Sequence, residues 1–258
     1  MPLLEIQNVT LFFGGLRAVY GFSLTLEGGE LLGLIGPNGA GKTTVFNLVS
    51  GFYRPTDGEI LFRGKNIAGL RPHAITALGM ARTFQNIRLW NSLTVFENLC
   101  VSQHYHLGYG FLDSVLRTRR FRDREHRVER NAEHLLEVLN LGHYAREYPK
   151  NLPYGLQRRL EIGRALSLQP KLLLLDEPAA GMNPSEADQL IELILWIRKE
   201  FRLTVWLIEH HMRVVMNVCE WIRVLDFGET IAEGTPEEVR KNPRVVRAYL
   251  GDEEAVHA

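Results

Sequence analysis

The segment from Gly36 to Thr44 constrains this chain more than any other feature, because its glycines and lysine have the spacing of a phosphate-binding loop. It fits the pattern G-x-x-x-x-G-K-[ST], in which backbone N–H groups and the positive end of the following helix converge on phosphate. We therefore expect it to bind a nucleoside triphosphate, favouring ATP, through Gly36, Pro37, Asn38, Gly39, Ala40, Gly41, Lys42, Thr43 and Thr44. Lys42 is expected to reach the β- and γ-phosphates, and Thr43 to bind Mg²⁺.

The flanking pattern predicts an α/β core. Glu30–Ile35 is a short apolar run typical of a strand buried on both faces, and Val45–Ser50 after the loop is predicted to be helical. Two further buried strands are predicted at Leu172–Leu175 and Thr204–Ile208, with a helix at Ser185–Lys199 between them. Alternation of strand and helix indicates a largely parallel sheet covered by helices.

The first part of the chain is predicted to contain strands that alternate in polarity, and the middle of the chain is predicted to be helical. Leu4–Val9 and Phe22–Glu27 alternate in polarity, which is typical of strands. Helix-spaced apolar residues fill Leu93–Val101, Val128–Leu139 and Leu156–Leu168, separated by a looser stretch at His104–Arg130. We expect the core and the antiparallel sheet within residues 1–84 and 170–235, a helical subdomain at 85–169, and a helical tail at 236–258, whose cap is Thr235 with Pro236 in the first turn.

Acidic residues follow the predicted buried strands. Asp176 and Glu177 end the strand at Leu172–Leu175, and ligands of open parallel sheets sit at the carboxyl ends of strands. Asp176 is expected to hold Mg²⁺ through its water shell, and Glu177 to act as general base toward the attacking water. Glu209-His210 repeats this arrangement after the next strand, and His210 is expected to sense the γ-phosphate.

Composition excludes several classes of protein. Apolar residues make up 45% and charged residues 23% of the chain, with formal net charge zero, so charge favours neither nucleic acid nor an anionic membrane. No apolar run is long enough to span a bilayer, and Met1–Glu5 lacks the features of a secretory signal. Cys100 and Cys219 have no metal-ligand or redox spacing. We expect a cytosolic chain that meets a membrane through partners.

The order of motifs resembles that of ABC-type ATPases across the whole chain. After the phosphate-binding loop come Thr83-Phe84-Gln85, Leu152–Gln157, Asp176-Glu177-Pro178 and Glu209-His210. The resemblance implies an α/β fold with a RecA-like mixed-sheet core, an antiparallel β subdomain and a helical subdomain. It also implies that Gln85 contacts Mg²⁺ and the transporter interface and takes part in catalysis, and that His210 is the switch histidine. Phe13 resembles the aromatic that stacks on adenine, with Phe12 an equal neighbour. Asn183 stands in the D-loop where many relatives have aspartate.

A narrower resemblance is to the ATP-binding subunits of branched-chain amino acid importers. It rests on the segments Phe13–Leu16, Arg82–Leu89, Tyr154–Ile162, Glu177–Pro184, Gly108–Arg130 and Asn242–Gly251. It implies a peripheral subunit at the cytoplasmic face of the inner membrane, paired head to tail with a second ATPase chain. It further implies two transmembrane permease subunits and, indirectly, an external substrate-binding protein. Leucine, isoleucine and valine are the implied substrates, while other amino acids, amides and urea stay open.

The chain departs from the family at the signature. The family sequence Leu-Ser-Gly-Gly-Gln, which contacts ATP bound on the opposite subunit, is replaced by Leu152-Pro153-Tyr154-Gly155-Leu156. Pro153 has neither a hydroxyl nor a backbone N–H, so Gly155 is the one ligand-contacting member retained. We hypothesise an asymmetric pair in which the second ATPase chain is not a copy of this one. The alternative is that Gly155 and the helix N-terminus suffice.

Three alternatives remain from the sequence. Arg117–Arg130 carries acids among its arginines, so it is either a solvated helix face or a contact for anionic lipid headgroups. An ABC ATPase acting on nucleic acid or ribosomes is disfavoured because the chain has one motif set and no basic surplus. A GTPase switch is disfavoured because no Asn-Lys-x-Asp sequence is present.

Overall fold

The computed structural model describes residues 1–104, 113, 118–210 and 212–250. The chain divides into two compact units, one formed by Met1–Arg82 with Lys171–Ala258 and the other by Thr83–Pro170. Thr83 and Phe84 fall in the helical unit, where the Phe84 carbonyl accepts a hydrogen bond from Arg158. The tail from residue 236 groups with the core unit, and its last eight residues lie outside the described part.

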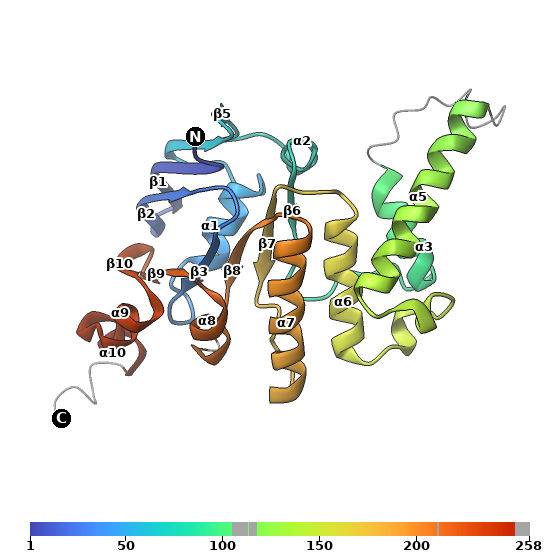
Figure 1. Ribbon diagram of the computed structural model, residues 1–258. Coiled ribbons are helices and arrows are strands. Elements are labelled where there is room, and N and C mark those ends of the chain that lie inside the picture. Colours follow the sequence, from blue (N-terminus) through green and yellow to red (C-terminus); the bar gives the residue numbers. More distant parts are fainter. Residues whose placement is uncertain (105–112, 114–117, 211, 251–258) are drawn as a thin grey trace. The chain divides into compact units, whose positions relative to one another are not determined.

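A six-stranded mixed sheet forms the centre of the first unit (Figure 1). Its strands lie in the order β10 (Glu229–Gly234), β9 (Trp221–Asp226), β3 (Leu31–Ile35), β8 (Thr204–Ile208), β7 (Leu172–Asp176) and β6 (Met80–Arg82). Neighbouring strands are parallel, except that β10 pairs antiparallel with β9. The buried strands expected at 30–35, 172–175 and 204–208 are confirmed as β3, β7 and β8.

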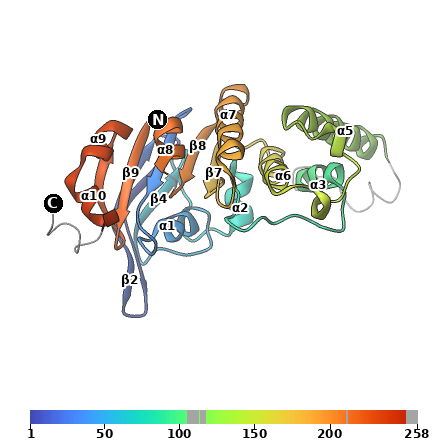
Figure 2. The same cartoon turned by 90° about the horizontal axis from the view of Figure 1, so that it is seen from below.

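A four-stranded antiparallel sheet forms the second layer of this unit. Its order is β2 (Leu16–Leu26), β1 (Leu4–Phe13), β4 (Asp57–Phe62) and β5 (Lys65–Asn66). Strands β1 and β2 are longer than expected and form a hairpin that extends from the sheet (Figure 2). Register shifts after Ile6, Val9 and Leu11 break the alternation of polarity. The alternation of polarity therefore predicts only the part of each strand that is distant from the turn of the hairpin.

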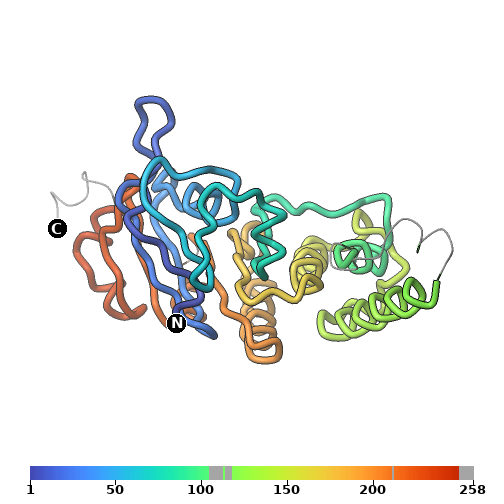
Figure 3. The backbone as a smooth tube through the Cα atoms, turned by 90° about the horizontal axis from the view of Figure 1, so that it is seen from above, coloured from blue at the N-terminus to red at the C-terminus, as the bar shows by residue number. Residues whose placement is uncertain are grey.

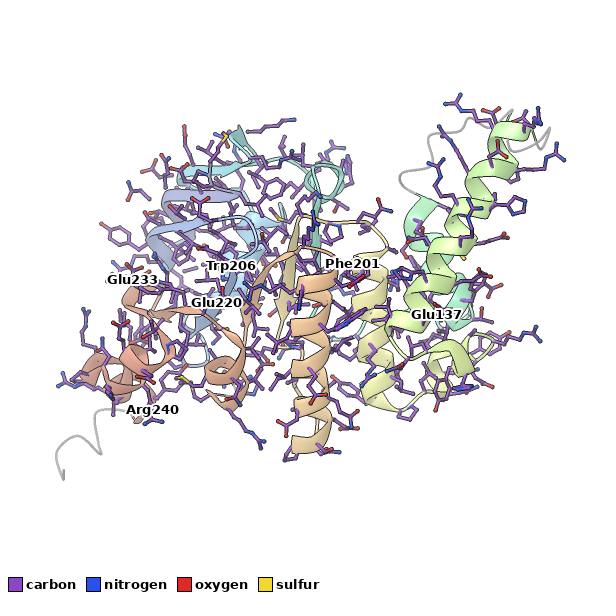
Figure 4. All side chains as sticks on the ribbon, viewed as in Figure 1. Glu137, Phe201, Trp206, Glu220, Glu233 and Arg240 are labelled. Carbon is purple, nitrogen blue, oxygen red and sulfur yellow. The ribbon has the colours of Figure 1, made fainter. Side chains whose placement is uncertain are left out.

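The hydrophobic core lies between the two sheets and around α1 (Lys42–Val49). Trp206 of β8, labelled in Figure 4, is fully buried and stacks on Phe22 of β2 at a centroid distance of 6.4 Å. Its edge meets Phe46 of α1 at 5.0 Å. One side chain thus joins both sheets and the helix that follows the phosphate-binding loop.

Two helices cover the face of the six-stranded sheet opposite α1, as Figure 2 shows. They are α7 (Pro184–Glu200), which joins β7 to β8, and α8 (Met212–Val218). A Cβ added at Gly33 of β3 would lie 2.8 Å from the Cys219 sulfur after α8, so glycine permits this close packing. Cys219 is buried and Cys100 partly buried, and both are free thiols.

Short helices complete the first unit. They are α2 (Pro72–Ala77), α9 (Pro236–Lys241) and α10 (Pro243–Leu250), the last two beside β9 and β10 (Figure 3). The predicted start of α9 is confirmed: Thr235 caps the helix in a capping box with Glu238.

The described residues of the second unit form the helices α3 (Val95–Gln103), α5 (Arg119–Val138) and α6 (Tyr154–Leu166), with 3₁₀ turns at Gly142–Tyr144 and Pro149–Asn151. The looser stretch expected up to Arg130 is wrong from Arg119 onward. Because the first buried side chain of α5 is Val128, the first turns carry no apolar stripe by which a helix is predicted. Gly108–Gly110 and Arg117 lie outside the described residues. Along the described chain, no helix combines the length and apolar character needed to cross a membrane.

Candidate nucleotide-binding and catalytic site

The phosphate-binding loop joins β3 to α1, and its glycines are required by the backbone. Gly36 and Gly41 have φ values of 152° and 98°. A Cβ at Gly36 would lie 2.1 Å from the Leu225 carbonyl oxygen, and one at Gly41 would lie 2.6 Å from that of Ala18. The loop is therefore wrapped against neighbouring backbone in a shape that side-chain-bearing residues cannot adopt without displacement.

Lys42, the first residue of α1, is buried and folds back over the loop. Its Nζ donates hydrogen bonds to the carbonyl oxygens of Gly36 at 2.7 Å and Pro37 at 2.9 Å. Burial lowers the pKa of the Lys42 ammonium, and the carboxylates of Glu177 and Asp176 oppose that shift. A desolvated ammonium beside the first N–H groups of a helix fits a phosphate anion. The Thr43 side chain next to it is exposed to solvent.

Asp176 and Glu177 follow one another where β7 ends, but their backbones differ. Asp176 completes the strand and is buried. Glu177 has a φ of 45°, a left-handed conformation that is uncommon for a side-chain-bearing residue. Its N–H donates to the Ile208 carbonyl at 2.9 Å, which holds the turn against the end of β8. Left-handed residues of this kind occur at functional sites and also in ordinary turns, and six other side-chain-bearing residues described in this chain have a similar φ.

The two strand ends that the sequence singled out lie together. The Nδ1 of His210 after β8 is 3.5 Å from the Glu177 carboxylate, with the His210 side chain 42% exposed and that of Glu177 13% exposed. Among residues of the first unit, Lys42, Asp176, Glu177 and His210 are thus brought to one edge of the sheet. Of the three side chains expected to meet Mg²⁺, Asp176 and Thr43 belong to this unit and Gln85 to the other, and all three offer the oxygen atoms that Mg²⁺ prefers.

Glu209 is a site residue that the sequence did not reveal. Its carboxylate is fully buried and accepts hydrogen bonds from the Ala179 N–H at 2.9 Å and from the His210 N–H at 3.2 Å. It therefore joins the backbone of His210 to the segment after Glu177. The polar step from Ile208 to Glu209 marks the end of the strand, but does not reveal that the carboxylate turns inward.

Replacing Glu209 by glutamine is expected to destabilise the protein by about 1–3 kcal/mol, because the amide nitrogen of Gln would face a buried N–H donor. Urea unfolding measures this change. Glu229→Gln is the matched control, because Glu229 makes an exposed ion pair with Arg17 and such pairs contribute little. Equal stability of the two variants would contradict the buried acceptor role.

The adenine-stacking candidates lie at the end of β1. Phe12 and Phe13 are similarly exposed, at 42% and 43%, and successive residues of a strand point to opposite faces. The Phe13 ring meets Tyr53 edge to face at 5.1 Å. Tyr53 lies in the turn after α1, so this contact places the Phe13 ring beside that turn.

Gln85 and Gly155 lie in the second unit, where a buried ion pair connects their segments. Arg158 of α6 bonds Glu161 at 2.6 Å and donates to the Phe84 and Gln85 carbonyls at 2.7 and 2.8 Å. Glu161 also accepts a hydrogen bond from the Arg88 N–H at 3.3 Å. Burial raises the pKa of the Glu161 carboxyl, which Arg158 opposes. The backbone around Gln85 is thereby fixed to the helix that begins with the signature.

The signature itself opens α6. Pro153 occupies the N-cap position and makes no side-chain cap hydrogen bond, while Gly155 lies in the first turn. The hydroxyl of Tyr154 accepts a hydrogen bond from Arg158 at 3.1 Å. Asn183 caps α7 in a capping box with Glu186, a role that aspartate would fill equally well.

Comparison with known proteins agrees with the resemblance seen in the motifs. A family model described as ABC transporter matches residues 19–180, and one described as branched-chain amino acid ATP-binding cassette transporter matches residues 229–255. The chain is 49% identical to the high-affinity branched-chain amino acid transport ATP-binding protein BraF of Pseudomonas aeruginosa, covering 97% of this chain and 98% of that protein. It is 47% identical to LivG of Escherichia coli, with the same coverage. A crystal structure of an ATP-binding cassette of an ABC transporter in its ADP conformation superposes with a TM-score of 0.85 at 32% identity, covering 98% of this chain and 100% of that one.

Proposed function

Because the chain belongs to the ABC transporter family, we propose that it is an ATP-hydrolysing subunit that powers a membrane importer of branched-chain amino acids. The observation that carries this proposal is the gathering of Lys42, Asp176, Glu177 and His210 at the edge of the sheet where the phosphate-binding loop lies. The extent of identity to BraF and LivG over nearly the whole chain supports the substrate class.

Each residue of the site has a distinct role in this proposal. The loop and Lys42 bind the phosphates, Glu177 accepts a proton from the attacking water, and His210 contacts the γ-phosphate from beside Glu177. Asp176, Thr43 and Gln85 would hold Mg²⁺, which when bound neutralises charge on the phosphates. The approach of His210 Nδ1 to within 3.5 Å of the Glu177 carboxylate supports the placement of these two side chains together.

The site is completed by a second, non-identical ATPase chain that pairs head to tail with this one. Gly155 of this chain would contact ATP held by the partner, and two permeases would receive the motion through the Gln85 segment. The buried Arg158–Glu161 pair supports this route, because it fixes the Gln85 backbone to the signature helix. The subunit would lie at the cytoplasmic face of the inner membrane.

Restoring the signature serine tests the asymmetry. Pro153→Ser is expected to tighten ATP binding at the partner's site by about tenfold or more, because a hydrogen bond to phosphate contributes about 1.5–3 kcal/mol. The measurement uses the reconstituted transporter with Glu177→Gln in this chain, so that only the partner's site turns over. Adding Tyr154→Gly and Leu156→Gln to Pro153→Ser restores more of the family signature and is measured in the same way. Tyr154→Gly also removes a hydrogen bond to Arg158.

Pro153→Ala is the matched control, since it restores the backbone N–H without a hydroxyl. Unchanged affinity and turnover in Pro153→Ser and in the triple variant would show that Gly155 and the helix N-terminus suffice. A gain in the serine variant that the alanine variant lacks would assign the effect to the hydroxyl.

The substrate class is tested by stimulation of ATPase activity in the same reconstituted complex. Binding protein loaded with leucine, isoleucine or valine is expected to stimulate hydrolysis. Stimulation by other amino acids, amides or urea, and not by these three, would contradict the proposed substrate class and indicate an importer of that other substrate.

A further inference from the structure

Arg82 is a buried cation that the catalytic roles above do not use. It is the last residue of β6, and its side chain is 6% exposed. Its Nη2 donates a hydrogen bond to Oδ2 of Asp176 at 2.7 Å, where the Asp176 side chain is 3% exposed. A charge-assisted bond of this length between two buried groups is strong and directional.

The other end of the guanidinium is fixed to α1. Nη1 donates to Oδ1 of Asn47 and to Oγ of Ser50, both at 2.8 Å. The rings of Phe46 and Phe52 lie 5.5 and 5.8 Å from the guanidinium carbon, within the range of cation–π contact. Arg82 therefore joins the carboxylate at the end of β7 to the last turn of the helix whose first turn carries Lys42 and Thr43.

We propose that Arg82 is a positioning residue for Asp176, orienting its carboxylate for the magnesium ion of bound nucleotide. The bond to Oδ2 fixes the rotation of the carboxylate and does not itself occupy Oδ1. Because the same guanidinium also bonds α1, it fixes the Asp176 carboxylate relative to the helix that follows the phosphate-binding loop. A lysine cannot replace it, since an ammonium lacks the planar fork that serves Asp176 and α1 together.

This inference rests on the proposed function, because it requires a magnesium–nucleotide complex at this site. Arg82 is expected to affect the binding of Mg²⁺ and not the binding of nucleotide in the absence of Mg²⁺. Nucleotide binding without Mg²⁺ depends on the loop and Lys42, which Arg82 does not contact through any of the bonds described above. A change at Arg82 that leaves α1 folded should therefore alter the dependence on Mg²⁺ and spare metal-free binding.

The experiment measures the affinity of the purified full-length chain for a fluorescent ADP analogue, first in EDTA and then across a Mg²⁺ titration. In Arg82→Gln, the Mg²⁺ concentration for half-maximal effect is expected to rise about tenfold or more, while affinity in EDTA changes less than about twofold. Arg82→Lys should show a smaller rise. Asn47→Ala, which removes one anchor on α1, should shift it in the same direction. Arg17→Gln, at an exposed ion pair with Glu229, is the control expected to match wild type.

Two results would overturn the inference. One is a Mg²⁺ titration in Arg82→Gln and Arg82→Lys that superposes on that of wild type. The other is an equal loss of affinity with and without Mg²⁺ in both Arg82→Lys and Asn47→Ala, together with a lower melting temperature, which would assign Arg82 to stability alone. Wild-type protein that binds no nucleotide in either condition would instead overturn the proposed function, and this inference with it. If Arg82→Gln fails to fold, the lysine and Asn47 variants still decide the question.

Discussion

Replacing Glu177 by glutamine is expected to leave ATP binding intact while ATP hydrolysis falls by about two to four orders of magnitude, the usual contribution of a general base. Glutamine has the shape of glutamate, so the strained turn at φ 45° and the bond from its N–H to Ile208 are retained. What is lost is the ability to accept a proton from the attacking water. The contact with His210 also changes from a carboxylate to an amide.

The measurement is a single-turnover ATPase assay on the assembled transporter, with ATP affinity determined in parallel. Glu192→Gln, an exposed position on α7, is the matched control for the change of glutamate to glutamine. Full hydrolysis in Glu177→Gln would remove Glu177 from the base role. A loss of ATP binding along with hydrolysis would instead assign this carboxylate to the structure of the site.

Replacing Lys42 by alanine is expected to weaken nucleotide binding by about two orders of magnitude or more. The estimate follows from two charge-assisted hydrogen bonds to phosphate at about 1.5–3 kcal/mol each. In the structure the ammonium is buried and bonded to the carbonyls of Gly36 and Pro37, so it is already placed inside the loop. Burial lowers the pKa of the Lys42 ammonium. The negative charge of a bound phosphate would oppose this lowering.

The measurement is equilibrium binding of a fluorescent ATP analogue to the purified chain, with circular dichroism to confirm folding. Lys65→Ala, at an exposed position of β5, is the control for loss of a lysine charge. Affinity within a few-fold of wild type in Lys42→Ala would contradict the assignment of this loop as the phosphate site.

The parts of the fold that could be predicted are those in which one local pattern dominates. β3, β7 and β8 are continuous apolar runs because both faces of each strand are buried, and the loop after β3 has a fixed spacing. α5 could not be predicted over its first turns, because an exposed, highly charged helix has no apolar period there. The bulges of β1 likewise hide the length of the hairpin.

The candidate site divides in the same way. The residues proposed to contact phosphate or water are recognised from local motifs, whereas the residues proposed to position them make contacts between distant segments. Arg82 bonds Asp176 across 94 positions of sequence, and Glu209 bonds Ala179 across 30. Nothing in either residue's local sequence distinguishes a buried partner from an exposed surface charge.

We infer that this chain hydrolyses ATP to power transport, in a site that another chain completes. The most direct measurement is the ATPase rate of the chain alone and of proteoliposomes containing it with its partner ATPase and permeases. We expect the isolated chain to hydrolyse ATP slowly and the assembled complex to be stimulated by binding protein loaded with leucine, isoleucine or valine. An isolated chain that hydrolyses ATP at the full rate, with no stimulation on assembly, would contradict it.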